Sequence, residues 1–396
     1  MKRMPGGMKV SVKDTDADTL YRTTEIQVGG RRLRTPLKAL NLHQYARVPL
    51  PVGGTAVNEV FRAVNVKHLG KAMTDMDAHT SLLNPIRLGT DAGRAHDAVS
   101  VVLLELDEIT LDADKIAYVE NMAYMGDIVA VPMVDALHRA ADPKKAFRDY
   151  VNFAKRFIDE VHKLNHKPIL GTMPPLPWLL TRDLADAYMD AGVDGFLFDF
   201  AGRTPSAAES SGLRHLLKRL KEEDKLESTL FYAVNANAGR AAAKPLGPGM
   251  VSAKDILSFG FNVDVLGLKH IGLRGPKEMY DKLEANGPIV RLFDRSAYAY
   301  RDAVPADAPA LLPTDTRVPL RLFDHQESWD RGRAIANMEQ HAREAEHLRT
   351  VIREHRVRKY LGGKKALESS DMDLFLDARR DLKRGQTSLG KSDWGL

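Results

Sequence analysis

The feature that most constrains the fold is a series of eight short apolar segments between residues 37 and 294, separated by stretches with helical character. Their apolar residues run almost continuously instead of alternating with polar ones, which is typical of strands buried on both faces of a parallel sheet. The eight segments are LKALNLH (37–43), VSVVLLELD (99–107), DIVAVPMVD (127–135), KPILGT (167–172), VDGFLFDF (193–200), TLFYAVN (229–235), NVDVLGLKH (262–270) and IVRLFD (289–294).

The stretches between these segments carry helix signals. Asp142 and Pro143 are a typical N-cap and first-turn pair, and apolar residues then recur at helical spacing up to Val161. Three more helices are predicted between a start signal and a glycine stop, namely Thr181 to Gly192, Ser252 to Gly260 and Pro276 to Gly287.

Strand followed by helix, repeated about eight times over roughly 250 residues, predicts an α/β fold of the (β/α)8 or TIM-barrel type. An open doubly wound sheet is the competing architecture, but no Gly-rich phosphate loop follows an early strand. An additional strand at Val60 to Val66 would shift the numbering of the first two strands. The expected domains are a basic N-terminal arm (1–36), a catalytic barrel (37–300), a linker loop (301–327) and a basic helical extension (328–396).

The 396-residue chain contains no cysteine. Disulfides and thiolate zinc sites are therefore excluded, and the helical extension is expected to have no zinc site. No apolar run approaches the roughly 20 residues that a membrane-spanning helix needs, so a cytoplasmic protein without membrane contact is expected. P-loop, GxGxxG and HExxH motifs are missing too, and no cofactor is predicted.

Positive charge collects at the two ends of the chain. Residues 331–396 hold fifteen Lys and Arg against ten Asp and Glu, residues 1–36 hold eight against four, and residues 1–330 are neutral overall. Basic ends on a neutral body suit a partner with a phosphate backbone, although a solvated Arg-rich helical surface explains the same charges.

Acidic residues stand at the ends of several predicted strands. In a barrel of this type the chemistry lies at the carboxyl ends of the strands, where this chain has Asp107, Asp135, Asp199 and Asp294. A carboxylate at the end of an apolar strand is unfavourable unless it is paired or solvated, so each residue is either functional, a helix cap or the partner of an arginine. Two carboxylates that face one pocket are what glycosyl transfer needs, one as nucleophile and one as general acid and base.

The chain resembles the tRNA-guanine transglycosylases, especially their archaeal branch and the phage relatives that insert 7-deazaguanines into DNA. The similarity covers roughly residues 95–380 and rests on three stretches and a weaker fourth. They are LFDRSAYAY (292–300), beside the family's Phe-Asp-Ser-Ala-Ser-Tyr motif; GDIVAVPMVDALHRAADPKKAFRDYVNFAKRF (126–157); KPILGTMPPLPWLLTRDLADAYMDAGVDGFLFDFAGRTP (167–205); and EHLRTVIREHRVRKYLGGKKAL (346–367).

The resemblance implies a role for each matching residue. Asp294 would be the nucleophile and Asp107 the general acid and base, although Asp107-Glu108-Ile109 stands where the family has Asp-Ser-Gly. The base-contacting residues would be Asp135, Gly171, Ala201 and Gly202. Arg203 and His270, which stand at strand ends, are further predicted substrate-binding residues.

The expected function is therefore the exchange of guanine for a 7-deazaguanine base in DNA or tRNA through a covalent aspartyl intermediate. The expected partners are nucleic acid and that free base, and a homodimer is compatible with this function. The alternative is a catalytically inactive barrel of the same superfamily that binds nucleic acid or a partner protein. An unrelated barrel with a phosphate site near Gly239 or Gly272 is a third reading.

Overall fold

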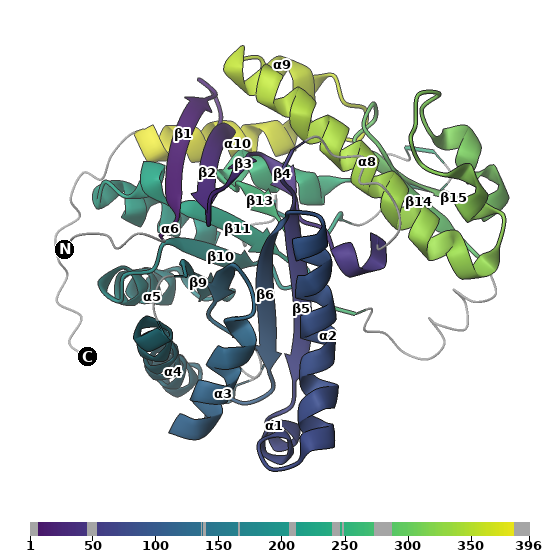
Figure 1. The fold of residues 1–396 in the computed structure, drawn as a ribbon. Helices are drawn as coiled ribbons and strands as arrows, with labels where there is room; N and C mark the ends of the chain where they lie inside the picture. Colours follow the sequence, from purple (N-terminus) through teal and green to yellow (C-terminus); the bar gives the residue numbers. More distant parts are fainter. Residues whose placement is uncertain are drawn as a thin grey trace.

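The computed structural model describes residues 7–45, 54–135, 137, 140–164, 167–205, 211–239, 246–247, 249–272 and 287–383. Within these residues the chain forms one large parallel sheet, two smaller antiparallel sheets and the helices packed on them (Figure 1). The mixed α/β class predicted from the sequence is thereby confirmed.

The parallel sheet has the strand order β4-β13-β11-β10-β9-β7-β6-β5, with the short β8 beside β6. Its strands are β4 (Leu37–Lys38), β5 (Val57–Val64), β6 (Val99–Leu106), β7 (Ile128–Ala130), β8 (Met133–Val134), β9 (Ile169–Met173), β10 (Gly195–Asp199), β11 (Leu230–Val234) and β13 (Val265–Leu266). Just after β4, the Leu40 backbone N–H donates to Val57 O at 2.9 Å, and the Glu59 N–H donates to Leu40 O at 2.7 Å. The first and last strands of the order therefore meet at Leu40.

Helices alternate with these strands along the chain. They are α1 (Val66–Ala72), α2 (Met76–Ala95), α3 (Ala113–Ala123), α4 (Pro143–Leu164), α5 (Trp178–Asp190) and α6 (Ser211–Glu222). The helices predicted after Asp142 and after Thr181 are confirmed as α4 and α5. The segment predicted as a helix from Ser252 instead forms the end of strand β12 and a 3-10 helix, and the helix predicted from Pro276 lies outside the described residues.

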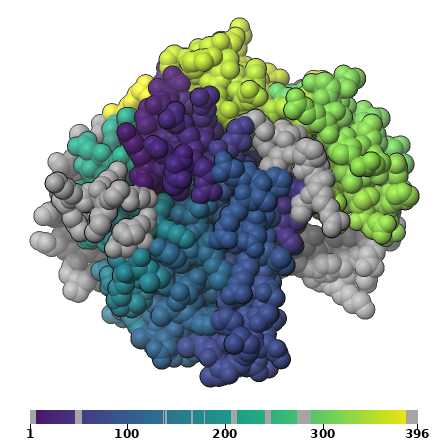
Figure 2. All heavy atoms as spheres, viewed as in Figure 1, coloured from purple at the N-terminus to yellow at the C-terminus, as the bar shows by residue number. Residues whose placement is uncertain are grey.

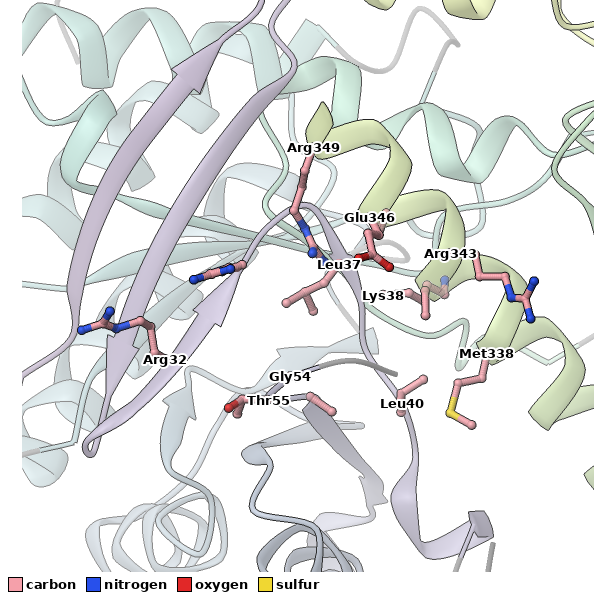
Figure 3. A pocket seen from close by; sticks show the side chains of 14 residues that line it. Arg32, Leu37, Lys38, Leu40, Gly54, Thr55, Met338, Arg343, Glu346 and Arg349 are labelled. Atoms are coloured by element: carbon pink, nitrogen blue, oxygen red, sulfur yellow. The ribbon is translucent and has the colours of Figure 1, made fainter. Parts of the chain in front are cut away.

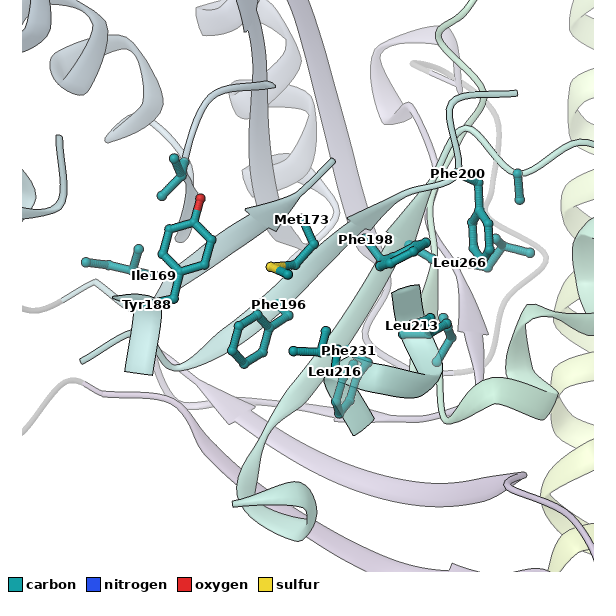
Figure 4. Close-up of a cluster of buried hydrophobic side chains, with 14 of the residues drawn as sticks. Ile169, Met173, Tyr188, Phe196, Phe198, Phe200, Leu213, Leu216, Phe231 and Leu266 are labelled. Carbon is teal, nitrogen blue, oxygen red and sulfur yellow. The ribbon is translucent and has the colours of Figure 1, made fainter. Parts of the chain in front are cut away.

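Because side chains alternate between the two faces of each strand, the parallel sheet has two hydrophobic cores. The outer core lies against the helices, and the inner core lies on the opposite face of the sheet. Phe196 and Phe198 of β10 pack into the cluster that contains α5 and α6, as Figure 4 shows, whereas Leu197 packs with the inward residues of the other strands. Successive side chains of a strand point to opposite faces, so the position of each residue along its strand decides whether it faces the helices or the inner core.

A small antiparallel sheet covers the amino ends of the parallel strands. It contains β1 (Lys9–Thr15), β2 (Arg22–Val28) and β3 (Arg31–Arg34), and Ile26 and Leu33 are buried in the inner core. The buried Arg22 side chain donates to Asp264 and to the carbonyl oxygens of Leu226 and Thr229. The predicted basic arm is therefore wrong for residues 9–34, because these residues fold onto the sheet.

The segment predicted as the eighth barrel strand belongs to another sheet. Strand β14 (Val290–Asp294) pairs with β15 (Ala299–Ala303), which pairs with β12 (Met250–Ser252), and all these pairs are antiparallel. The predicted place of this segment in the parallel sheet is wrong. β13 pairs directly with β4, and the additional parallel strand is β5, which overlaps the alternative strand at Val60 to Val66 and lies beside β6.

The segments after β15 pack on the rest of the chain. The predicted linker contains the 3-10 helices at Pro305–Leu311 and Leu320–Phe323, in which Ala308 and Phe323 are buried. It leads to helices α8 (Gln326–Arg353), α9 (Val357–Gly362) and α10 (Ser369–Lys383). The predicted extension is correctly helical, but Phe375 of α10 lies edge-on to Tyr21 and Phe261, so α10 shares the main core.

None of the helices in the described part of the chain is both long and apolar enough to cross a membrane.

Candidate functional site

A cluster of polar side chains joins strand β5 to the segment that follows β13. Glu59 is the third residue of β5 and is completely buried, between Asn58 and Val60, which both pack on the outer side. A buried carboxylate inside a strand is unfavourable unless it is hydrogen-bonded, so its partners define the local structure.

Three donors surround the Glu59 carboxylate. His270 Nε2 lies 2.6 Å from Oε1, the Leu268 backbone N–H donates to Oε1 at 2.8 Å, and the Tyr232 hydroxyl donates to Oε2. Burial raises the pKa of Glu59, but these hydrogen bonds outweigh burial and the pKa falls below its ordinary value. The Phe61 ring stacks on His270 at 4.0 Å between centroids. The result is an ionised glutamate that fixes the orientation of an imidazole.

The loops after β10, β11 and β13 are joined through Asn235. Its side-chain N–H donates to Asp199 Oδ1 at 2.9 Å, and its side-chain oxygen accepts from the His270 N–H at 2.8 Å. The Ala201 N–H also donates to Asp199 Oδ1, at 2.8 Å, and the Gly202 N–H donates to Asn235 O. Ala201, Gly202 and His270, predicted separately as substrate-binding residues, are thus brought together.

Two carboxylates line one small cavity at the carboxyl edge of the parallel sheet. Its volume is about 10 Å³, and its lining residues are Glu105, Met133, Val134, Tyr150, Thr172, Pro174 and Asp199. Glu105 belongs to β6, and Asp199 is the last residue of β10. These two strands are separated in the sheet by β7 and β9. A space of this size has room for about one water molecule, so Glu105 and Asp199 face a common, narrow space.

Asp107 has a structural role at the end of β6. Its carboxylate accepts hydrogen bonds from the Val66 N–H at 2.8 Å and from the Asn65 side chain at 2.5 Å. Because Asn65 itself caps α1, Asp107 holds the start of that helix.

Asp294 lies outside this cluster, in the β14-β15 hairpin. It accepts from the Ser296 hydroxyl at 2.6 Å and the Ala297 N–H at 3.2 Å, and it pairs with Arg301 at 2.5 Å. Burial raises the pKa of Asp294, but these partners outweigh burial and lower it. The arginine beside it is Arg301, whereas Arg295, the predicted neighbour, pairs with Glu344.

Asp294 lines a cavity of about 600 Å³ with mostly basic and polar residues. The charged and polar residues of its lining are Asp294, Arg295, Ser296, Arg301, Gln340, His347, Tyr360 and Lys364. Asp294 is the single carboxylate among these described residues, and Asp107 is not among them. The predicted pairing of Asp294 with Asp107 at one pocket is therefore wrong.

The other predicted residues lie at the same edge but differ in orientation. A Cβ atom on Gly171 would lie 2.6 Å from the Tyr188 ring, so that position faces α5 and not the inner core. Asp135 follows β8 and is half-buried. The exposed Arg203 continues the turn after β10, where its carbonyl oxygen accepts from the Asn237 N–H.

Sequence analysis missed Glu59, Glu105 and Tyr232 as members of the cluster. For Glu105 the available signal is a glutamate flanked by apolar residues in a strand, because such a residue needs a partner. Among the residues that the structure describes, no group of three or more His, Asp or Glu side chains is placed to hold a metal ion.

Neither a protein-family model nor a curated protein matches this sequence. Many solved structures are similar to this chain in part, among them the following three. The carboxyl transferase domain of Rhizobium etli pyruvate carboxylase with pyruvate and biocytin is 12% identical, over 67% of this chain and 38% of that one, with a TM-score of 0.34. The same domain with oxamate and biotin is 12% identical, over 86% and 51%, with a TM-score of 0.37.

A Cellulomonas fimi endo-beta-1,4-mannanase double mutant is 12% identical over 57% of this chain and 62% of that chain, with a TM-score of 0.33. The chain thus spans less than two thirds of the length of each of these three solved chains. At this level of similarity the three structures give no basis for a substrate, so the functional argument depends on the chain's own residues.

Proposed function

We propose that this protein is an enzyme of glycosyl transfer that acts at the carboxyl edge of a (β/α)8 barrel. The junction of β4 with β5 at Leu40 supports a closed barrel. The observation that carries the proposal is that Glu105 and Asp199 line the same small cavity, which would have to widen to admit a sugar. Double displacement at an anomeric carbon needs such a pair, one carboxylate as nucleophile and one as acid and base.

Asp199 is the better nucleophile of the two. Its Oδ1 faces the N–H groups of Ala201 and Asn235, which stabilise negative charge on the carboxylate and fix its orientation. Glu105, which lies beside Met133 of β8, would act as the general acid. His270, which is held by Glu59, would contact the substrate.

The proposed substrate is a guanosine in DNA or tRNA, and the proposed product carries a 7-deazaguanine. The resemblance of residues 95–380 to transglycosylases supports this choice, together with the basic chain ends. Asp199 would attack C1′ while the bond to guanine breaks, and Glu105 would protonate the departing base. The incoming base would then attack C1′, displace Asp199 and return its proton to Glu105. The target base must leave its stack for this reaction.

A base-exchange assay tests the proposal. The protein is incubated with radiolabelled guanine and either tRNA or duplex DNA, and incorporated label and denaturation-resistant adducts are measured. Asp199→Asn should lower exchange by about 1,000-fold or more, and Glu105→Gln by about 100-fold. Asp294→Asn and Asp107→Asn serve as matched controls that should retain exchange. Loss of exchange only in Asp294→Asn would assign the nucleophile to that residue.

A catalytically inactive barrel that binds nucleic acid is the second candidate. It is favoured by the roles of Asp294 and Asp107, which are held by Arg301 and by the start of α1. This candidate predicts nucleic-acid binding in a filter assay without exchange in either substrate. Exchange by the wild type would exclude it.

A further inference from the structure

The largest unexplained charge cluster lines a cavity of about 480 Å³. The cavity lies between β3, β4, residues 54–56 and helix α8. Five of its lining residues are basic and one is acidic: Arg32, Arg34, Lys38, Arg343 and Arg349, with Glu346. Ligand pockets commonly have volumes of roughly 300–1,000 Å³, so this one has room for a nucleotide-sized molecule.

The sequence explains why the cavity is hollow and basic. On α8 the residues Met338, Ala342, Ala345 and Arg349 follow one another at helical spacing on one face, and the two alanines leave space there. On β3, Arg32 and Arg34 share one face of the strand, because Leu33 between them points into the core.

Two of the five cations already have carboxylate partners. Arg343 pairs with Asp315 at 2.7 Å and Glu339 at 2.6 Å, and Arg32 pairs with Glu25 at 3.4 Å. Figure 3 shows Arg343 pointing away from Arg349, which extends from α8 toward Leu37. The Lys38 ammonium donates to Gly267 O at 2.8 Å, a neutral acceptor.

Arg34 and Arg349 have no carboxylate within ion-pair distance among the described residues, and the buried Arg349 Nε has no hydrogen-bond partner there. Burial and, in smaller measure, the charge of Arg34 lower the pKa of Arg349, while Glu346 acts in the opposite direction. Two guanidinium groups that repel each other at one cavity are an arrangement that a bound oxyanion stabilises. Thr55, on the wall opposite α8 in Figure 3, adds a hydroxyl group.

We propose that this cavity binds a phosphate group through Arg34 and Arg349, as a second ligand site separate from the carboxyl edge. The ligand is a phosphate monoester or diester, carried either by a free nucleotide or by a nucleic acid strand. This inference does not depend on the proposed glycosyl transfer, because it uses none of the residues assigned to that reaction.

Thermal unfolding of the whole chain tests the site. Sodium phosphate at about 10 mM, compared with sodium chloride at equal ionic strength, should raise the Tm of the wild type through binding to the native state. The double variant Arg34→Gln/Arg349→Gln should lose this rise. Arg353→Gln, which removes an exposed arginine from the same helix, should keep it. An equal rise in the wild type and the double variant, or no rise in either, would refute the site.

Titrations with AMP and with a short single-stranded oligonucleotide then identify the source of the phosphate. The double variant should bind the preferred probe about 100-fold more weakly than the wild type, because each guanidinium contributes about tenfold. Ala342→Leu fills the cavity without changing charge and should also abolish binding. If Ala342→Leu binds both probes normally, the ligand does not enter the cavity and the proposal is wrong.

Discussion

His270 Nε2 lies 2.6 Å from the buried Glu59 Oε1, although the two residues are 211 positions apart in the chain. Glu59 comes from the second parallel strand and His270 from the loop after the last one, so the pair exists only because those strands approach each other in the folded sheet. The Phe61 ring stacks on the imidazole and further restricts its orientation. This geometry makes the pair the most directly testable part of the site.

Replacing the Glu59 carboxylate by an amide should disturb this site, although the two groups are nearly equal in size. In Glu59→Gln the neutral side chain can no longer accept charge-assisted hydrogen bonds from His270, Tyr232 and Leu268. We expect the free energy of unfolding to fall by about 1–3 kcal/mol, and base exchange, where present, by about 100-fold. Urea denaturation and the exchange assay measure the two effects. Unchanged stability would show that the carboxylate is not charged in the native state.

Gly267→Ala should displace the same carboxylate sterically. A Cβ atom at this position would lie 2.3 Å from Glu59 Oε2 and 2.8 Å from the Tyr232 ring. We expect a loss of about 1–3 kcal/mol in stability, typical of an overpacked interior. Gly272→Ala is the control, because its Cβ would have no atom within 4 Å. Equal unfolding midpoints for the two variants would contradict the close approach.

Breaking the ion pair between Arg22 and Asp264 should be strongly destabilising. Both side chains are buried, and Asp264 also accepts from the Thr24 hydroxyl at 2.8 Å and the Phe231 N–H at 2.9 Å. Asp264→Asn leaves the Arg22 charge buried without a counter-charge, for an expected loss of about 3–5 kcal/mol in chemical denaturation.

The exposed pair of Arg94 and Asp91 is the matched control for that measurement. Asp91→Asn should change stability by about 0.5 kcal/mol or less, because water screens the pair. Similar losses in both variants would mean that burial of the Arg22 pair has no special effect.

The stability of the protein should depend on pH through Glu120. Burial and the nearby Glu160 raise the pKa of this carboxyl to about 7, against the effect of Lys167, and its Oε1 has no partner among the described residues. The folded state therefore holds the proton more tightly than the unfolded chain. This contribution to stability is complete below the ordinary carboxyl pKa and is lost as the pH rises through about 7.

Glu120→Gln removes that titration. Relative to the wild type, the variant should gain about 1–2 kcal/mol in unfolding free energy between about pH 5 and about pH 8. Urea denaturation at the two pH values measures the gain. If the difference between variant and wild type is constant over this range, Glu120 does not titrate in it.

Residues near one another in the chain explain the successful part of the sequence prediction. The apolar run Val99–Leu106 is completely embedded in the parallel sheet, and the helix after Asp142 has the periodic apolar face that buries Phe147, Tyr150 and Phe157. These elements follow from local hydrophobic patterns, which do not depend on residues far away in the chain.

The strand at the end of the predicted barrel was assigned wrongly because a short apolar run does not specify its partner. β14 buries one face against α8, where Phe293 stacks on His341 at 4.6 Å, and it pairs antiparallel with β15. Strand β5, predicted only as an alternative, buries two polar side chains: Asn58 is hydrogen-bonded to Ser100 and Gly89 O, and Glu59 to distant donors.

The sequence by itself determined the α/β class, the positions of most strands and the absence of thiol chemistry, because composition and local periodicity are sufficient for these properties. Only the tertiary structure decided which carboxylates share a pocket. Asp107 supports the start of a helix, and Asp294 pairs with Arg301. Glu105 and Asp199 line one cavity. The physical reason is that a buried charge requires partners, and those partners come from strands that are far apart in the chain.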